Sequence, residues 1–302
     1  MIFSRRVLFA FSGVLLFFAF SGRFFPVHAQ TLQDKVNRVV DESRADVGVA
    51  ISTLSGDERA TFQADKPFPM LSVYKFPVVL AFLHEVDRGH FGLDDTLWIK
   101  PSYLPPGTHS PLRDKYPGGQ VHVSLREIVS DTLVLSDNNG CDILLRLLGG
   151  PERVDKYLEQ AGITGMTIGA TEAEMHRNRE NVFKNRATPD SSNQLLRLFY
   201  EKKLLKPETQ AFLWKLMQDS LTGPGRLRAP LPAGTVLIHK TGTGDPSATD
   251  GITVNDVGIL LLPDGKPVFI SVFITRSPDA ILETEKTIAA LSQVAWAHFV
   301  PR

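Results

Sequence analysis

The sequence predicts an α+β fold, in which an antiparallel sheet from both chain ends is flanked by helices and an all-helical subdomain is inserted in the middle. Two observations support this prediction. Strand-like segments occur near the N-terminus and again after residue 234, whereas the residues between them show mostly helical patterns. The chain also has 302 residues, 43% of them hydrophobic, which is enough to bury a large core.

The N-terminal end predicts one helix and two strands. Apolar residues recur at helical spacing between Leu32 and Arg44. Residues 47–51 then form an apolar run typical of a strand, and residues 55–57 form a turn into a second strand near residues 60–63.

The middle of the chain predicts a series of helices. Ser124 and Glu127 have capping-box spacing and open a helix that extends toward Leu135. A glycine pair closes the next predicted helix, over residues 141–148. Three more helices are expected over residues 151–160, 191–202 and 207–218.

The C-terminal end returns to strands, over residues 235–239, 257–262 and 268–275. Residues 263–266 form a hairpin turn, and a last helix follows over residues 281–299. We therefore expect a sheet part at about 30–68 and 227–302 and a helical part at about 69–226. The chemistry would fall at the seam between them, where pockets are common.

Residues 1–29 are predicted to be a secretory signal peptide. Arg5 and Arg6 precede an apolar run over residues 7–20, and residues 27–29 offer a small-residue cleavage site, so that Gln30 would begin the mature chain. A membrane anchor is the alternative, but the apolar run is short for a span. We expect a periplasmic or secreted protein without stable membrane attachment.

The composition argues against several other classes of function. Lys and Arg total 33, as do Asp and Glu, and no basic block stands out, so nucleic acid is not an expected partner. The eight histidines show no metal-ligand spacing, so no metal or cofactor is expected. Cys141 is the single cysteine and lies in an apolar stretch, which favours a buried inert thiol over a reactive one.

Three short motifs carry the chemistry of this chain. They are Ser-x-x-Lys at 72–75, Ser-Asp-Asn at 136–138 and Lys-Thr-Gly at 240–242. Each alone has an ordinary interpretation: a surface helix start, a helix N-cap and a plain strand end. In this order they supply a nucleophile, proton carriers, an amide and a cation, the groups needed for acyl transfer through a serine ester.

The predicted position of each motif suits its role. Ser72 would lie at a helix N-terminus, where free N–H groups can stabilise an oxyanion. Lys75 follows one turn later, and burial near cations favours the neutral lysine that can take a serine proton. Gly242 would let the substrate backbone approach a strand edge.

With the stretches at 69–77, 110–117 and 231–235, the motifs resemble the class A serine β-lactamases, most closely the branch with the PER and VEB extended-spectrum enzymes. The resemblance covers essentially the whole mature chain. It implies a monomer that hydrolyses the β-lactam amide bond of penicillins and cephalosporins without metal or cofactor, and so confers β-lactam resistance.

The resemblance also implies residue roles. Ser72 would be the nucleophile, with Lys75, or Glu172 through a water, as its base. Ser136 would protonate the leaving nitrogen, and backbone N–H groups of Ser72 and Thr243 would form the oxyanion hole. Glu172 would then activate the water that hydrolyses the acyl-enzyme. The implied substrate-binding residues are Asn138, Lys240, Thr241, Gly242, Thr243, Arg226, His109 and His176.

Several positions depart from the usual family pattern. Glu174 competes with Glu172 for the deacylating role, and His176 stands where an Asn usually helps to hold the water. The Arg–Asp pair that closes this loop in many members is absent, because the matching positions are Ala170 and Asn185. The strand at 252–257 has no Arg, so Arg226 is expected to bind the substrate carboxylate, with Arg228 in a structural role.

Two other functions share the three motifs. One is a D-alanyl-D-alanine peptidase, which lacks the deacylating glutamate, and the other is a penicillin-binding sensor that acylates without turnover. Glu172 argues against the peptidase. A sensor would also be expected to carry a membrane-spanning segment, and the mature chain has no apolar run of that length.

Overall fold

The computed structural model describes Met1, residues 30–245 and residues 251–300. The predicted signal peptide and its cleavage site therefore lie outside the described residues. Among the helices of the described ranges, none is both long enough and apolar enough to cross a membrane.

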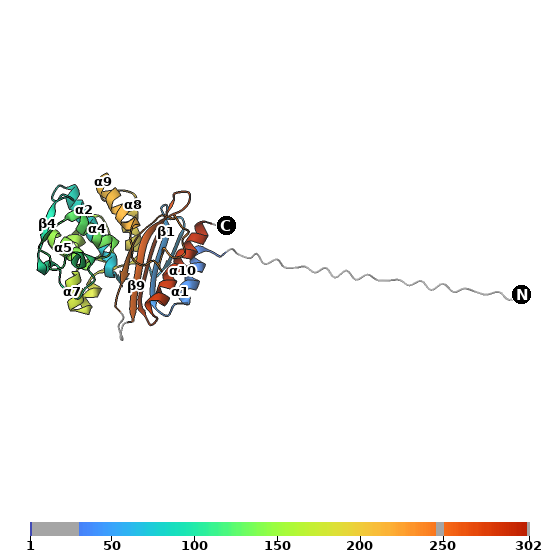
Figure 1. Cartoon of the computed structure of the whole chain (residues 1–302). Coiled ribbons are helices and arrows are strands. Elements are labelled where there is room, and N and C mark those ends of the chain that lie inside the picture. Colours follow the sequence, from blue (N-terminus) through green and yellow to red (C-terminus); the bar gives the residue numbers. More distant parts are fainter. Residues whose placement is uncertain (2–29, 246–250, 301–302) are drawn as a thin grey trace. The chain divides into compact units, whose positions relative to one another are not determined.

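A five-stranded antiparallel sheet joins the two ends of the chain, as predicted. The strand order is β2-β1-β10-β9-β8, and β1 pairs with β10 from Asp46↔Thr275 to Thr53↔Val268. This order leaves β8 at one edge of the sheet (Figure 1). The strands are β1 (Asp46–Thr53), β2 (Arg59–Phe62), β8 (Leu237–Thr243), β9 (Ile252–Leu261) and β10 (Pro267–Ser277).

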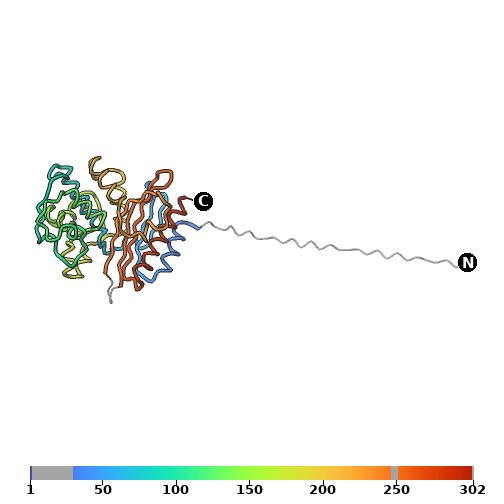
Figure 2. Tube along the Cα trace, in the orientation of Figure 1, coloured from blue at the N-terminus to red at the C-terminus, as the bar shows by residue number. Residues whose placement is uncertain are grey.

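The two terminal helices, α1 (Leu32–Asp41) and α10 (Ile281–Phe299), lie side by side over one face of the sheet (Figures 1 and 2). The apolar stripe of α1 is buried, as its periodicity predicts, and packs in a core that includes Ile288 and Leu291 of α10. α1 is shorter than predicted, since Glu42 is already its C-cap.

The helical part surrounds α2 (Lys75–Asp87). Every residue of α2 from Lys75 to Leu83 is buried, which is typical of a central helix. The other α-helices are α3 (Pro111–Lys115), α4 (Leu125–Val134), α5 (Asn138–Leu148), α6 (Pro151–Gln160), α7 (Glu172–Arg177), α8 (Pro189–Tyr200) and α9 (Pro207–Gln218).

Short elements complete this part of the chain. The 3-10 turns are η1 (Leu71–Tyr74), η2 (Pro101–Tyr103) and η3 (Arg179–Lys184). The small sheets are β3 (Phe68–Pro69) with β7 (Arg186–Ala187) and β6 (Met166–Thr167), and β4 (Thr96–Ile99) with β5 (Val121–Ser124).

Two predicted boundaries were wrong at the motifs. α5 begins at Asn138 rather than at residue 141, because the Asp137 side chain accepts a hydrogen bond from Gly140 N (2.7 Å) and caps the helix. β8 continues to Thr243, so the Lys-Thr-Gly motif lies within a strand rather than after one. Its polar residues are paired with β9 from Lys240↔Val257 to Thr243↔Val254.

The close approach of β1 to the phenylalanine pair Phe68–Phe273 gives a first prediction. A Cβ added at Gly48 would lie 2.3 Å from Cε2 of Phe68, whose ring stacks on Phe273 at 6.1 Å. We expect Gly48→Ala to lower the free energy of unfolding by about 1–3 kcal/mol through overpacking, measured by denaturant unfolding. In the double variant with Phe68→Leu, the loss of unfolding free energy should be smaller than the sum of the losses in the two single variants. Strict additivity would contradict the explanation.

Candidate active site

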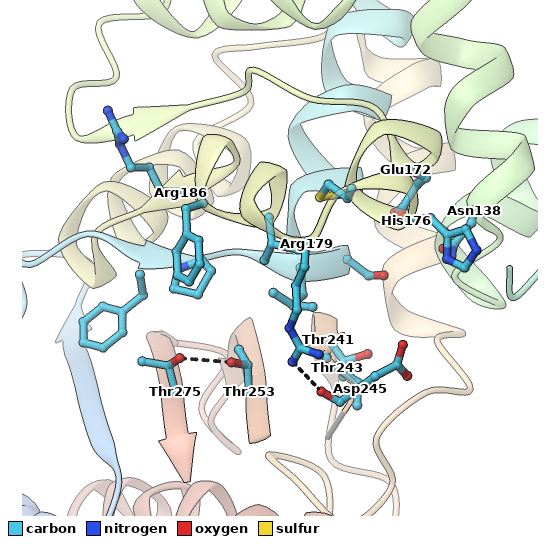
Figure 3. Close-up of a pocket in the computed structure, with 18 of the residues that line it drawn as sticks. Asn138, Glu172, His176, Arg179, Arg186, Thr241, Thr243, Asp245, Thr253 and Thr275 are labelled. Atoms are coloured by element: carbon cyan, nitrogen blue, oxygen red, sulfur yellow. Dashed lines mark hydrogen bonds between the residues drawn. The ribbon is translucent and has the colours of Figure 1, made fainter. Parts of the chain in front are cut away.

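Residues of all three motifs line one cavity of about 970 Å³ between the sheet edge at β8 and the helical part (Figure 3). Ser72, Ser136, Asn138 and Thr241 are among its lining residues. Glu172 joins them from α7, as Figure 3 shows. The structure therefore brings together side chains that are far apart in the sequence.

The loop before Ser72 is fastened to the sheet. The Asn255 side chain of β9 donates hydrogen bonds to the backbone oxygens of Pro69 (2.9 Å) and Met70 (3.0 Å). A Cβ at Gly242 would lie 2.4 Å from Met70 O, so this glycine makes room for the loop. The sequence suggested room for substrate instead, and the observed contact supplies a different reason for the glycine.

Two fully buried lysine side chains, Lys75 and Lys240, lie close to Ser136. Lys75 Nζ donates to Ser136 O (2.7 Å) and to Asn138 Oδ1, and Lys240 Nζ donates to Thr241 O (3.0 Å). Burial, and next the nearby Lys75 ammonium, lower the pKa of Lys240 well below its ordinary value.

Ser136 lies between the two ammonium groups. Its Oγ is 3.0 Å from Lys240 Nζ and 3.4 Å from Lys75 Nζ. Its backbone has a φ of 60°, an uncommon conformation for a serine. The following Asp137 stabilises this turn, since its carboxylate accepts hydrogen bonds from Ser110 Oγ (3.0 Å) and Leu112 N (2.7 Å).

Glu172 supplies the negative charge nearest to Lys75, with Oε1 3.2 Å from Lys75 Nζ. This buried oxygen accepts no hydrogen bond from the described residues, and its close contact is the ion pair with Lys75. The rival Glu174 is engaged elsewhere: its carboxylate accepts from Thr171 N (2.8 Å) in a capping box. The geometry therefore favours Glu172 over Glu174.

Asp142 of α5 holds the start of α7. Its carboxylate accepts hydrogen bonds from Glu172 N (2.7 Å) and Ala173 N (2.9 Å). Burial raises the pKa of Asp142 to about 6. The two N–H donors favour the charged form and lower the pKa, but the effect of burial is larger. The backbone of Glu172 is thus fixed by a side chain that the sequence did not single out.

A neutral side chain replaces the missing ion pair of the Glu172 loop. Asn185 is fully buried, and its Oδ1 accepts from Gly169 N (2.9 Å) and Ala170 N (3.0 Å). Its amide donates to Ala170 O (2.9 Å). One amide thus satisfies three backbone groups across the loop, which answers how the loop is anchored.

The edge of β8 presents backbone groups that are not paired with β9. Gly244 N donates to Thr253 O (2.9 Å), and the register pairs Thr243 with Val254. Because hydrogen-bonded and non-hydrogen-bonded pairs alternate in an antiparallel ladder, Thr243 N–H and C=O face away from β9. Since β8 is an edge strand, they face the open side, as an oxyanion hole on this strand requires.

Arg226 is buried and bound on almost all sides. Its Nε donates to Glu285 Oε1 (2.9 Å), and its Nη1 donates to Gly242 O (3.0 Å) and Asn255 O (2.9 Å). Its Nη2 donates to Thr243 Oγ1 (2.6 Å). A two-pronged contact with a substrate carboxylate, which the sequence suggested, would require breaking these bonds.

Arg228 has the structural role that was predicted for it. It donates to Thr235 O (2.6 Å) and Leu237 O (3.2 Å), and so holds the start of β8.

The two rim histidines lie at the mouth of the cavity. His109 is exposed, and its Nε2 is 2.9 Å from Leu135 O, next to Ser136. His176 is also exposed and lies near Gly107 across the mouth (Figure 3). Both line the cavity.

Cys141 is fully buried, as predicted, and its thiol donates to Tyr74 Oη (3.3 Å). Burial raises the pKa of this thiol well above its ordinary value, which keeps it protonated. In the described ranges, no three His, Cys, Asp or Glu side chains are grouped so that they could hold a metal ion.

Four further residues shape the site without having been predicted. Asp142, Asn255 and Glu285 act through the contacts above, and Thr222 Oγ1 lies 2.6 Å from Thr241 Oγ1. Their partners are 19 or more residues away in the sequence. The only local signal was a polar residue inside an apolar segment, as at Asp142 and Asn255.

Comparisons with known proteins agree with this geometry. The model of the β-lactamase enzyme family matches residues 31–299. β-Lactamase VEB-1 of Pseudomonas aeruginosa is 37% identical over 90% of this chain and 92% of its own. Extended-spectrum β-lactamase PER-1 of the same organism is 33% identical over 94% and 92%. The crystal structure of the TLA-3 extended-spectrum β-lactamase superposes with a TM-score of 0.87 at 37% identity, covering 89% of this chain and 98% of that one.

The chain belongs to the β-lactamase enzyme family. It is a class A β-lactamase, a hydrolase of cyclic amides, as the resemblance implied. The predicted fold class is confirmed by the same structural neighbours.

The Asn185 clamp gives a second prediction. Asn185→Ala leaves two backbone N–H groups and one carbonyl without partners, at a cost of about 1–3 kcal/mol for each buried group. Asn185→Asp keeps the acceptor but sets a carboxylate against Ala170 O, which disfavours the charged form. Folding should therefore raise the pKa of the new carboxyl. The Asp variant should lose little stability at pH 4, and the loss should grow as the pH rises through that pKa. Thermal unfolding between pH 4 and 8 measures the stability of both variants. An Asp variant that is equally stable at every pH would contradict the role of the Asn185 amide in holding the loop.

Proposed function

We propose that the chain hydrolyses the β-lactam amide bond of penicillins and cephalosporins through an acyl-enzyme on Ser72. Ser72 Oγ attacks the ring carbonyl, the C–N bond breaks, and the serine proton passes to the neutral amine form of Lys75 or, through a water, to Glu172. N–H groups of Ser72 and Thr243 stabilise the oxyanion. The observation that carries the proposal is the position of Ser136 Oγ between the buried amino groups of Lys75 and Lys240. There it can give its proton to the leaving nitrogen and take one back from Lys75 once that amine is protonated.

Deacylation is assigned to Glu172. Its Oε1 has no hydrogen-bond donor among the described residues and is held 3.2 Å from Lys75 Nζ, next to the cavity that Ser72 lines. A water bound there would lose a proton to the carboxylate and attack the ester carbonyl. His176 lies on the same helix and lines the cavity, so it can help to orient the water, and its protonation would affect that role.

The substrate carboxylate is bound by Thr243, Thr241 and the Lys240 ammonium. Thr243 Oγ1 accepts a hydrogen bond from Arg226 Nη2, so its own hydrogen is free to donate to the substrate. Arg226 thus acts by orienting Thr243. Asn138, whose Nδ2 donates to Thr108 Oγ1 (2.6 Å), would bind the substrate's side-chain amide, and His109 would contact it at the rim.

The remaining predictions follow from the family. Two of the relatives are named as extended-spectrum enzymes, which supports activity on cephalosporins. We also propose that residues 1–29 direct export and are removed, that the mature enzyme works as a periplasmic or secreted monomer without stable membrane attachment, and that it confers β-lactam resistance.

A third prediction separates acylation from deacylation. Ser72→Ala should abolish hydrolysis of a chromogenic cephalosporin, because no nucleophile remains. Glu172→Gln should still acylate but release product about 10²–10⁴-fold more slowly, the usual contribution of a general base. Mass spectrometry should therefore show a covalent adduct in the Glu172 variant and none in the Ser72 variant. A parent protein that gives one stoichiometric burst without turnover would indicate a peptidase or sensor instead.

A fourth prediction concerns Thr243. Thr243→Val has nearly the same shape but no hydroxyl, so KM should rise by about tenfold or more, the effect of one lost hydrogen bond to a charged group. Thr243→Ser restores the hydroxyl and should stay close to the parent enzyme. Steady-state kinetics on one penicillin and one cephalosporin measure both variants. Equal losses in the Val and Ser variants would exclude the hydroxyl as the carboxylate ligand.

A further inference from the structure

A second cavity, of about 430 Å³, lies in the helical part between the C-terminal half of α2 and α6. No residue of the three motifs lines it. His84, on its wall, is nine residues beyond Lys75 along α2, a separation of about 13 Å at the rise of an α-helix. The volume is many times the roughly 30 Å³ of a water molecule, so the cavity can hold a ligand of several heavy atoms.

Positive charge is concentrated around this cavity, although the chain as a whole is neutral. Arg88, Arg153 and Lys156 line it. The single carboxylate of its wall, Glu85, is already bound, by Arg88 Nη1 at 3.3 Å and by His90. Arg153 and Lys156 are exposed and form no ion pair with any described residue, so their charges are available to a ligand.

One wall residue adds an unused hydrogen-bond donor. The ring of Tyr157 packs against His84 at 5.2 Å between centroids. Its hydroxyl is buried and has no partner among the described residues. Burial raises the pKa of Tyr157, so the hydroxyl keeps its proton. The hydroxyl is covered from the cavity, so the cations of the wall are the groups that match a ligand rich in charged oxygen atoms.

We propose that this cavity binds a small, soluble, multivalent oxyanion of the phosphate or polycarboxylate class. Arg153 and Lys156, three residues apart on the exposed side of α6, hold it from one side, and Arg88 holds it from α2. A guanidinium can bind two oxygens of such a group at once. The two cations without an ion pair among the described residues, Arg153 and Lys156, favour a multiply charged ligand, because a monovalent anion would neutralise only one of them.

The test uses inorganic pyrophosphate and citrate as probes, titrated calorimetrically into the purified protein at constant ionic strength. We expect saturable binding of at least one probe, and a rise in the melting temperature that follows its concentration. The comparison of the two probes shows whether phosphate or carboxylate oxygens are preferred. Saturable binding of neither probe overturns the proposal.

A matched pair of double variants locates the site. Arg153→Gln with Lys156→Gln should weaken probe binding by about tenfold or more, which corresponds to about 1.4 kcal/mol. Lys35→Gln with Arg38→Gln removes two charges at the same spacing on α1 and should leave binding unchanged. Equal effects of the two pairs, or no effect of the first, overturn the proposal. Neither pair of residues lines the active-site cavity, so both double variants should hydrolyse β-lactams at the rate of the parent protein. A failure of the binding proposal can therefore be distinguished from a failure of the proposed enzyme activity.

Discussion

The whole active site depends on burying two lysine amino groups at one serine hydroxyl. Removing an ammonium ion from water costs several kcal/mol, and this cost is tolerated only where acceptors and a counter-charge replace the lost water. Here the acceptors are Ser136, Asn138 and the backbone of Thr241, and the nearest carboxylate is that of Glu172. The Ser-Asp-Asn turn, the Lys-Thr-Gly strand and the Glu172 loop are therefore needed together, because each satisfies part of the same buried charge.

The sheet brings these pieces to one place. Its central pairing joins the first and last strands of the chain, and its edge strand carries Lys240 and Thr243. Asn255, on the next strand, holds the loop before Ser72 through two hydrogen bonds. Because the cavity lies between the sheet edge and the helical part, its geometry is complete only when both ends of the chain have folded against the middle.

Local patterns were sufficient to predict the fold and the motifs. Helical and strand periodicities depend on neighbouring residues, and the three motifs are contiguous, so one sequence reveals them. The contacts that fix the site depend instead on distant partners. Asp142 lies 30 residues before Glu172, and Arg226 lies 59 residues before Glu285. Arg226 was therefore expected at the substrate rather than inside a buried network, and β8 was predicted too short because its polar motif is typical of a strand end.

Two side chains anchor the loop that carries Glu172: the Asp142 carboxylate at the start of α7, and the uncharged Asn185 amide across the loop. All the backbone contacts of Asn185 are hydrogen bonds between neutral groups, and the side chain is fully buried. An ion pair in this place would have tied these contacts to the protonation of its acid. With an amide instead, the Asn185 contacts keep the same charge at every pH, whereas the Asp142 contacts depend on the ionisation of a carboxyl group whose pKa is about 6.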